Sequence, residues 1–204
     1  MSDIQTALDA LNSKGFNAVY AADAQAALDH VLSLIDQNDT IGAGGSATLY
    51  ETGIIDVLVE RGHAVYQSDL AQKRGLNRDE AKRLGMTADV YLTSTNALTL
   101  EGDLVNIDCS GNRVAAMLYG PGKVIVVVSR NKLTNNPHTA VARIKKYACP
   151  PNARRLNFNT PCATTGVCSD CDSPDRLCNV VARIQRPPRG MEYHVVLIDA
   201  DFGF

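Results

Sequence analysis

Hydrophobic and polar residues alternate along the chain with two different periods. Apolar residues recur every three or four positions over residues 4–11 and 23–36, which predicts amphipathic helices. Short apolar runs at 16–20 and 40–43 are typical of strands. The succession continues with strands predicted at 63–67, 89–95 and 123–129. Helices are predicted at 47–61, with a break near Gly53, and at 78–84, 113–119 and 138–148. Strands that alternate with helices predict an α/β fold with a mostly parallel sheet.

Three further segments refine this fold. The run Val124–Val128 is continuously apolar and mostly β-branched, as expected for a central strand that is covered on both faces. Residues 97–108 predict a hairpin that turns at Glu101-Gly102-Asp103. A Pro- and Cys-rich C-terminal excursion over 149–178 precedes two final strands near 180–185 and 193–199.

The composition sets limits on domain number and location. With 204 residues, 45% hydrophobic and 21% charged, the chain has ordinary globular composition and no Pro/Gly/Ser-rich linker. We expect one domain over 1–204, with a helical N-terminal part over 1–40 and a Cys-rich segment over 149–179. The N-terminus shows no signal-peptide pattern and no apolar run is long enough to span a membrane, so we expect a cytoplasmic protein.

Charge is distributed unevenly along the chain. Residues 1–110 contain 7 Lys and Arg against 16 Asp and Glu, whereas residues 111–204 contain 13 against 6. We expect the two halves to pack together and neutralise each other, and the basic half is compatible with a small anionic ligand. A nucleic-acid partner is not favoured, because no basic run is interleaved with aromatic residues.

A glycine-containing loop follows the strand predicted at 40–43. Its residues Gly44 and Gly45 permit close backbone approach to a ligand, and Ser46 stands where the next helix begins. A tight turn with Ser46 as the helix cap explains the same residues equally well. The loop is therefore a candidate ligand site with a structural alternative.

Polar residues also surround the predicted hairpin and follow the central strand. The candidate ligand-binding residues there are Thr95, Asn96, Thr99, Asn106, Gly111, Asn112, Arg113, Asn131 and Lys132. Arg113 and Lys132 are cations that can hold an anionic group, and Glu101 is the carboxylate that can act as a catalytic base. Turn formation is the alternative explanation for the Asn and Gly residues.

Four cysteines provide the most specific chemical pattern. Cys162, Cys168, Cys171 and Cys178 have the spacing C-x5-C-x2-C-x6-C, so four thiols lie within 17 residues. Such thiols can converge on one metal centre, which is favoured over disulfides in a reducing compartment. The spacing leaves an iron–sulfur cluster and zinc open as cofactors. The remaining two, Cys109 and Cys149, stand apart and are predicted to be small packing residues.

Several of these blocks together resemble the lactate-utilisation (LUD) domain family, in the family's order and from about residue 41 to the C-terminus. The resembling residues are Gly44–Leu49 with Glu51 and Gly53, Thr95–Thr99, Gly102 with Val105-Asn106, Gly111–Ala116, Gly120-Pro121, Arg130–Lys132, and Pro161-Cys162 onward through Arg176–Asn179.

The resemblance implies a three-layer α/β sandwich similar to ribose-phosphate isomerases, glucosamine-phosphate deaminases and CoA transferases. It also implies a component of an organic-acid (lactate) oxidation system, with a small anionic metabolite as ligand and iron–sulfur oxidoreductase subunits as partners. Homo-oligomer formation stays open. If the chain is an enzyme, it is an oxidoreductase component. The alternatives are a non-catalytic accessory or regulatory metabolite-binding module, and an isomerase or acyl-transfer enzyme of the same fold.

Overall fold

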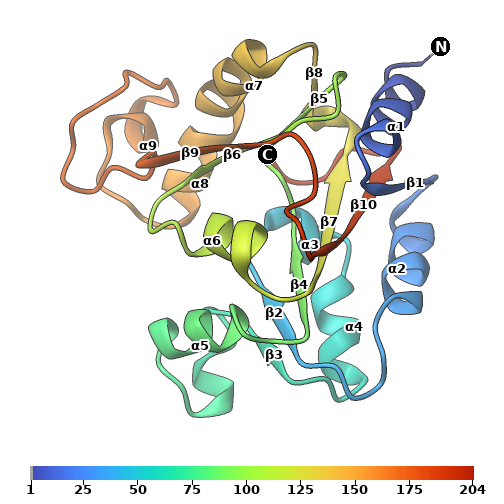
Figure 1. Ribbon diagram of the computed structural model, residues 1–204. Helices are drawn as coiled ribbons and strands as arrows, with labels where there is room; N and C mark the ends of the chain where they lie inside the picture. The colour runs from blue at the N-terminus through green and yellow to red at the C-terminus, as the bar shows by residue number, and fades with distance from the viewer. Residues whose placement is uncertain (1) are drawn as a thin grey trace.

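A six-stranded parallel sheet lies at the centre of the computed structural model, which describes residues 2–204 (Figure 1). All neighbouring strands in it run parallel, in the order β1-β10-β7-β4-β2-β3. The strands are β1 (Asn17–Ala21), β2 (Ile41–Ala43), β3 (Val65–Tyr66), β4 (Val90–Thr93), β7 (Lys123–Ser129) and β10 (Glu192–Ile198). The parallel α/β sheet predicted from the alternation of elements is confirmed.

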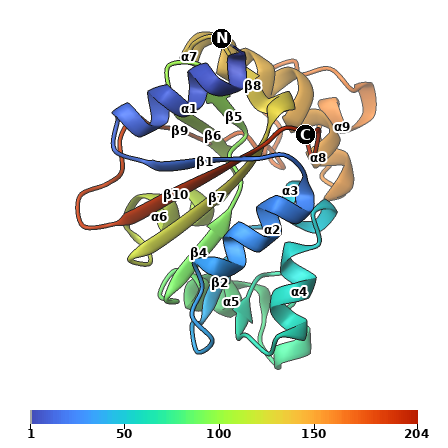
Figure 2. The same cartoon turned by 90° about the vertical axis from the view of Figure 1, so that its right-hand side faces the viewer.

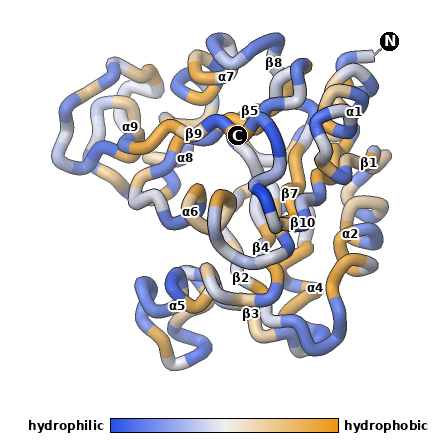
Figure 3. Tube along the Cα trace, in the orientation of Figure 1, coloured by the Kyte–Doolittle hydropathy of each residue, from blue (hydrophilic) through white to orange (hydrophobic). Residues whose placement is uncertain are grey.

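Strand β7 shows why this sequence forms a doubly covered sheet. Val124, Val126 and Val128 pack in one core and Ile125 and Val127 in the other, and all five are fully buried. Because successive side chains of a strand face opposite sides, an unbroken β-branched run serves both faces at once. Figure 3 shows hydrophobic residues concentrated along the strands of this sheet.

Helices cover both faces of the sheet (Figure 2). The first face carries α2 (Ala24–Ser33), α3 (Ala47–Glu51) and α4 (Ile54–Glu60), and the second carries α1 (Asp3–Ser13) and α6 (Asn112–Tyr119). Gly53 separates α3 from α4 with a φ of +70°, as the expected break in the helix over 47–61 requires. None of the helices within residues 2–204 combines the length and apolar character needed to cross a membrane.

Helix α5 (Arg78–Gly85) lies at the edge of the sheet, against β2 and β3. It approaches the backbone of β2 so closely that a Cβ at Gly42 would lie 2.0 Å from the Gly85 carbonyl oxygen. Glycine at position 42 is therefore a packing requirement, in addition to its place before the glycine loop.

A second, smaller sheet adds a layer on the side of α1 and α6. Its order is β8-β5-β6-β9, with β5 (Ala97–Thr99), β6 (Leu104–Asp108), β8 (Leu133–Thr134) and β9 (Val180–Ile184). The predicted hairpin is confirmed as the antiparallel pair β5–β6. The strand predicted at 180–185 belongs here, antiparallel to β6, and not to the parallel sheet. The other face packs on α7 (Pro137–Arg143), the π-helical turn η3 (Ile144–Ala148) and α8 (Cys149–Arg155).

Two segments have more regular structure than their composition indicates. Within the helical N-terminal part over 1–40, the strand predicted at 16–20 is β1, an edge strand of the central sheet that pairs with β10. The Cys-rich segment begins with a helix, since α8 starts at Cys149, and α9 (Pro161–Thr165) follows. Residues 166–179 then contain neither helix nor strand.

Candidate functional site

A cavity of about 410 Å³ lies where the parallel strands end. The segments directly after β2 and β4 line it, and the chain continues from β2 to β3 on one side of β2 and returns to β4 on the other. Such a reversal opens a crevice at the carboxyl ends of the strands, where α/β proteins bind ligands. Its polar and charged lining includes Ser46, Asp69, Arg78, Lys82, Ser94, Thr95, Asn96, Asp108, Asn112, Arg113, Lys132, Asn152 and Arg155.

Lys132 is the buried cation of this cavity. It closes the 3-10 turn η2 (Arg130–Lys132) directly after β7 and is only 4% exposed. Its Nζ donates to Thr48 Oγ1 at 2.6 Å and to Ser94 Oγ at 3.2 Å. An ammonium group has three donors, so one remains for a ligand.

The charge of Lys132 is not neutralised by an ion pair, although Glu51 lies near enough to raise its pKa by an amount smaller than the effects that lower it. None of the ion pairs formed within residues 2–204 includes it. Burial, reinforced by the positive charges of Arg143 and Arg113, lowers the pKa of Lys132 to about 7. A buried amine of this kind is suited to hold an anion or to transfer a proton near neutral pH.

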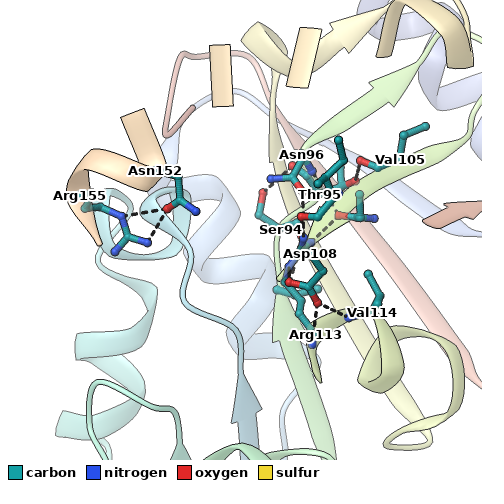
Figure 4. Close-up of polar contacts among 12 residues, drawn as sticks. Ser94, Thr95, Asn96, Val105, Asp108, Arg113, Val114, Asn152 and Arg155 are labelled. Atoms are coloured by element: carbon teal, nitrogen blue, oxygen red, sulfur yellow. Dashed lines mark hydrogen bonds and ion pairs between the residues drawn. The ribbon is translucent and has the colours of Figure 1, made fainter. Parts of the chain in front are cut away.

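Arg113 has a different role, because its guanidinium is already used by the protein (Figure 4). Its Nη1 donates to Ser94 O and to Asn106 Oδ1, and its Nη2 donates to Asn96 Oδ1 at 2.9 Å and to Ile107 O at 3.0 Å. Its Nε lies 3.8 Å from Asp108 Oδ1. Arg113 therefore ties the end of β4 to the end of β6 and contributes charge, but its donors do not face a ligand.

Two of the four predicted asparagines, Asn96 and Asn106, complete this junction. Asn96 Oδ1 also accepts from the Ile107 N–H at 3.0 Å, and Asn106 Oδ1 accepts from the Asn96 N–H at 3.3 Å. Asn106 is fully buried, and its Nδ2 has no hydrogen-bond partner among residues 2–204. Asn96 lines the cavity and is half-buried, and its Nδ2 donates to no group within the described chain. Asn96 is thus the amide in a position to contact a ligand.

The glycine loop forms the predicted helix cap, and part of it also lines the cavity. Ser46 caps α3, because its hydroxyl accepts from the Leu49 N–H at 3.3 Å, and Ser46 and Gly45 line the cavity. Gly44 lies just behind them, where a Cβ would come within 3.2 Å of Arg113 Cδ. The loop and the Arg113 junction are therefore packed against each other.

Besides Gly44 and Asn106, three further predicted ligand-binding residues do not line the cavity. Thr99 is fully buried in the hairpin, where its hydroxyl accepts from the Asp103 N–H at 2.9 Å. Gly111 begins α6 with a φ of +79°. Asn131 holds the segment 202–204, donating to Gly203 O at 3.2 Å. These residues shape the surroundings of the site rather than its lining.

Glu101 also lies outside the cavity, which removes the support for its role as catalytic base. It is exposed in the turn between β5 and β6, and this turn packs on α1, where a Cβ at Gly102 would lie 2.9 Å from Ala10 C. The hairpin carries Glu101 away because β5 starts at the cavity and the turn forms at its other end. Thr95 and Asn96, just before β5, stay in the site.

The structure adds residues that periodicity does not indicate. Arg78 and Lys82 come from α5, and Asp69 lies 2.7 Å from Arg78. Across the cavity, Arg155 donates to Asn152 Oδ1 at 2.8 Å on α8, facing the Ser94–Arg113 group in Figure 4. In the sequence these residues are indistinguishable from ordinary solvent-exposed helix positions. No local pattern therefore predicts that they line the cavity.

The four cysteines of the predicted metal site line a second, small cavity, together with Cys149. Cys149 packs in the core of the second sheet, as predicted, and its Sγ also lies 3.3 Å from Cys178 Sγ, so it does not stand apart from the other cysteines. All six cysteines are free thiols. As the side chains stand, no three Cys, His, Asp or Glu residues within 2–204 are arranged to bind one metal ion.

A comparison with known families decides the relationship of this chain. The model of the LUD domain matches residues 4–198. The chain belongs to the LUD domain family. The match includes β1 and α2, which lie before the blocks that carry the sequence resemblance. The lactate-utilisation type inferred from those blocks is confirmed at the level of the family.

Two solved structures match this LUD-domain protein to different extents. A DUF162 family protein from Deinococcus radiodurans matches with a TM-score of 0.57 and 12% sequence identity, covering 97% of this chain and 99% of that chain. Ribose 5-phosphate isomerase A from Methanocaldococcus jannaschii matches with a TM-score of 0.37 and 15% identity, covering 76% and 64%. The first comparison establishes the same fold along the whole chain. No curated protein matches the sequence.

Proposed function

We propose that this LUD-domain protein binds a small organic-acid anion such as lactate at the strand ends, as a component of an organic-acid oxidation system. The observation that carries the proposal is Lys132, a buried amine with a free donor and no carboxylate partner in the described chain. Burying such a group is costly unless a counter-charge arrives. An anionic ligand supplies that charge.

The remaining charges of the cavity support an anion. The basic lining residues are Arg78, Lys82, Arg113, Lys132 and Arg155, and the acidic ones are Asp69 and Asp108. Both carboxylates have basic partners in the lining, and Lys82 pairs with Asp79 at 3.0 Å. Lys132 and Arg155 are left without a carboxylate partner among the described residues. A carboxylate or phosphate group bound between Lys132 and Arg155 would neutralise their positive charge.

Lys132 also replaces Glu101 as the group that can move a proton. With a pKa of about 7, a substantial fraction of Lys132 is neutral at neutral pH. The ammonium form of Lys132 binds the anion. Proton transfer requires the amine form, in which Lys132 accepts the proton of the hydroxyl next to the carboxylate while Arg155 holds the carboxylate. Oxidation further requires an electron acceptor, which the family resemblance assigns to iron–sulfur oxidoreductase subunits.

The test measures binding and turnover separately. Calorimetric titration compares the wild type with Lys132→Met. The titrants are lactate, glycolate, inorganic phosphate and ribose 5-phosphate, and they include anions larger than lactate because the cavity has room for them. Lys73→Met, a substitution of an exposed lysine in η1 (Gln72–Arg74), is the matched control. We expect hydroxy-acid binding that Lys132→Met removes and Lys73→Met retains.

Turnover with an artificial electron acceptor then separates the two functional classes. Oxidation of the bound hydroxy acid supports an oxidoreductase component. Binding without oxidation supports the accessory metabolite-binding alternative, which fits a cavity whose lining contains no histidine and no unpaired carboxylate within residues 2–204. Absence of anion binding in the wild type overturns the proposal.

A further inference from the structure

Five of the six cysteines of this protein surround one small cavity. Cys149 comes from the first turn of α8 and Cys162 from α9, and both are buried. The irregular segment 166–179 contributes Cys168, Cys171 and Cys178. The cavity volume is about 20 Å³, enough for a single atom of the size of water and too small for an organic ligand. Thiols gathered from three segments around such a space suit a metal centre.

The closest thiol pair already has a spacing near that of metal ligands. Cys149 Sγ and Cys178 Sγ are 3.3 Å apart. Two thiolates on one tetrahedral metal, each bonded at about 2.3 Å, are separated by about 3.8 Å. A small outward shift of either side chain therefore admits a metal between them.

Hydrogen bonds hold other thiols in orientations that suit thiolates. The Asp170 N–H donates to Cys168 Sγ at 3.4 Å. Cys162 Sγ lies 3.4 Å from Thr160 Oγ1. Donors of this kind stabilise sulfur that carries negative charge, as in iron–sulfur and zinc sites.

Positive charge stands next to the thiols. Arg176 donates to the carbonyl oxygens of Cys171 and Cys178, which folds the segment around the cavity. Lys145, from η3, lies 2.8 Å from Asp170, and Arg176 lies 2.7 Å from the same carboxylate. The two cations exceed the charge of Asp170 and favour an anionic thiolate centre beside them.

The thiol cavity shares a wall with the anion cavity. Cys149 and Leu177 line both spaces. A group bound to Cys149 would thus be separated from the anion site by a single layer of side chains. This position could not be read from the four-cysteine spacing, because Cys149 precedes Cys162 by 13 residues and lies on a helix.

We propose that Cys149 and the four downstream cysteines form a binding site for a thiophilic metal centre in contact with the wall of the anion cavity: a single zinc ion in a space of the present size, or an iron–sulfur cluster once the loop has moved outward. The side chains are not yet gathered around one point. Residues 167–178 lie between α9 and β9 and belong to no helix or strand, so this loop can rearrange around the metal without breaking a regular element. Metal binding then completes the local fold. The contact with an anion site rests on the proposed function, whereas the metal site does not.

The experiment begins with the full chain purified without oxygen. Elemental analysis of iron, acid-labile sulfide and zinc identifies the resident metal, and the stripped protein is then titrated with Co²⁺ as a spectroscopic probe. We expect one metal centre per chain and a thiolate-to-cobalt absorption band. Iron with sulfide and visible absorption would identify a cluster, and colourless protein with zinc would identify a single ion. Either supports the site.

Serine substitutions assign the ligands. We expect Cys149→Ser and Cys178→Ser each to weaken cobalt binding about tenfold or more and to reduce the thiolate band. Cys109→Ser is the matched control, because Cys109 does not line the thiol cavity. Circular dichroism checks that each variant folds. An unchanged cobalt spectrum in Cys149→Ser overturns the assignment of Cys149.

Two further outcomes overturn the metal site as a whole. One is absence of stoichiometric iron, zinc or cobalt in folded protein. The other is a Cys149–Cys178 disulfide, found by mass spectrometry in protein kept under reducing conditions. A change in the cobalt spectrum on addition of lactate or phosphate supports the shared wall, and no change overturns it. Because Lys132→Met should keep its cobalt affinity, loss of anion binding and loss of metal binding are distinguishable.

Discussion

Two buried charges at opposite ends of the β5–β6 hairpin have opposite surroundings. Asp103, fully buried at the turn, is paired with Lys14 and Arg183, each at 2.6 Å. Lys132, nearly as buried at the cavity, donates hydrogen bonds within residues 2–204 only to the hydroxyls of Thr48 and Ser94. The paired charge fastens the hairpin to its neighbours, while the unpaired one is held ready for a ligand. Burial alone therefore does not identify a functional charge. The presence or absence of an ion-pair partner distinguishes a structural charge from a ligand-binding one.

The largest effect on stability is expected at the paired charge. Asp103→Asn leaves Lys14 and Arg183 without their shared partner and is expected to lower the free energy of unfolding by about 3 kcal/mol. Urea denaturation measures the change. Glu101→Gln, two residues away in the same turn, is the control. Equal stability of Asp103→Asn and wild type would contradict the comparison.

The unpaired charge should behave in the opposite way. Lys132→Met is expected to weaken anion binding about 100-fold, because a charged hydrogen bond in a buried site is lost. The same variant should not lower the free energy of unfolding, since methionine fills the space without burying an amine. Titration calorimetry measures the anion affinity and urea denaturation measures the free energy of unfolding, both on one preparation of the variant. A destabilised variant would show that Lys132 is a structural charge like Asp103.

Arg113 allows the comparison to be sharpened, because it is a cation at the site with structural contacts. Arg113→Lys cannot reproduce the bonds to Asn96, Asn106 and Ser94, so we expect a loss of about 2 kcal/mol of stability and about tenfold weaker anion binding. Both changes should occur together, unlike in Lys132→Met. Retained stability with lost binding would instead make Arg113 a ligand contact.

The pH dependence of anion affinity reports the unpaired amine directly. Since the pKa of Lys132 is lowered to about 7, affinity should be highest below pH 7 and fall by up to tenfold per unit as pH rises above it. The unfolded chain, with the ordinary pKa of 10.5, binds more protons between about pH 7 and 10.5. The contribution of Lys132 to the free energy of unfolding therefore increases with pH between about pH 7 and 10.5. Titration calorimetry from pH 6 to 9 provides the test, with Lys132→Met as the baseline; a flat affinity profile would contradict it.

The smallest effect is expected at the turn carboxylate. Glu101→Gln should change neither anion affinity nor unfolding, because Glu101 is exposed and outside the cavity. The binding and denaturation assays above measure both. A reduced turnover rate in this variant would restore Glu101 as a catalytic candidate.

Much of the architecture was predictable because it depends on local patterns. The apolar run of β7 identifies a doubly covered strand, Gly53 identifies the break between α3 and α4, and the turn at Gly102 identifies the hairpin. The polar strand ends at Ser46 and Asn96 likewise indicate a site, since parallel strands place their carboxyl ends at one edge.

The roles within the site were less predictable. In the sequence, Arg113 and Lys132 are equivalent as cations. Only their hydrogen-bond partners distinguish them: the Nη donors of Arg113 are bonded to protein groups, whereas Lys132 keeps a donor for a ligand. Glu101 lies five residues from Asn96, yet a hairpin places the two at opposite ends of a strand. Such differences depend on long-range contacts that no spacing encodes.

The sequence by itself determined the parallel α/β sheet, the hairpin, the polar strand ends and the clustering of cysteines, because each follows from periodicity, turn chemistry or close spacing along the chain. The tertiary structure decided the second sheet, the approach of α8 to the strand ends, the absence of an ion-pair partner for Lys132 among the described residues and the meeting of Cys149 with Cys178. These features bring together residues that are far apart in the chain. The strength of each interaction depends on how far the surrounding groups bury it from water, which the sequence does not specify.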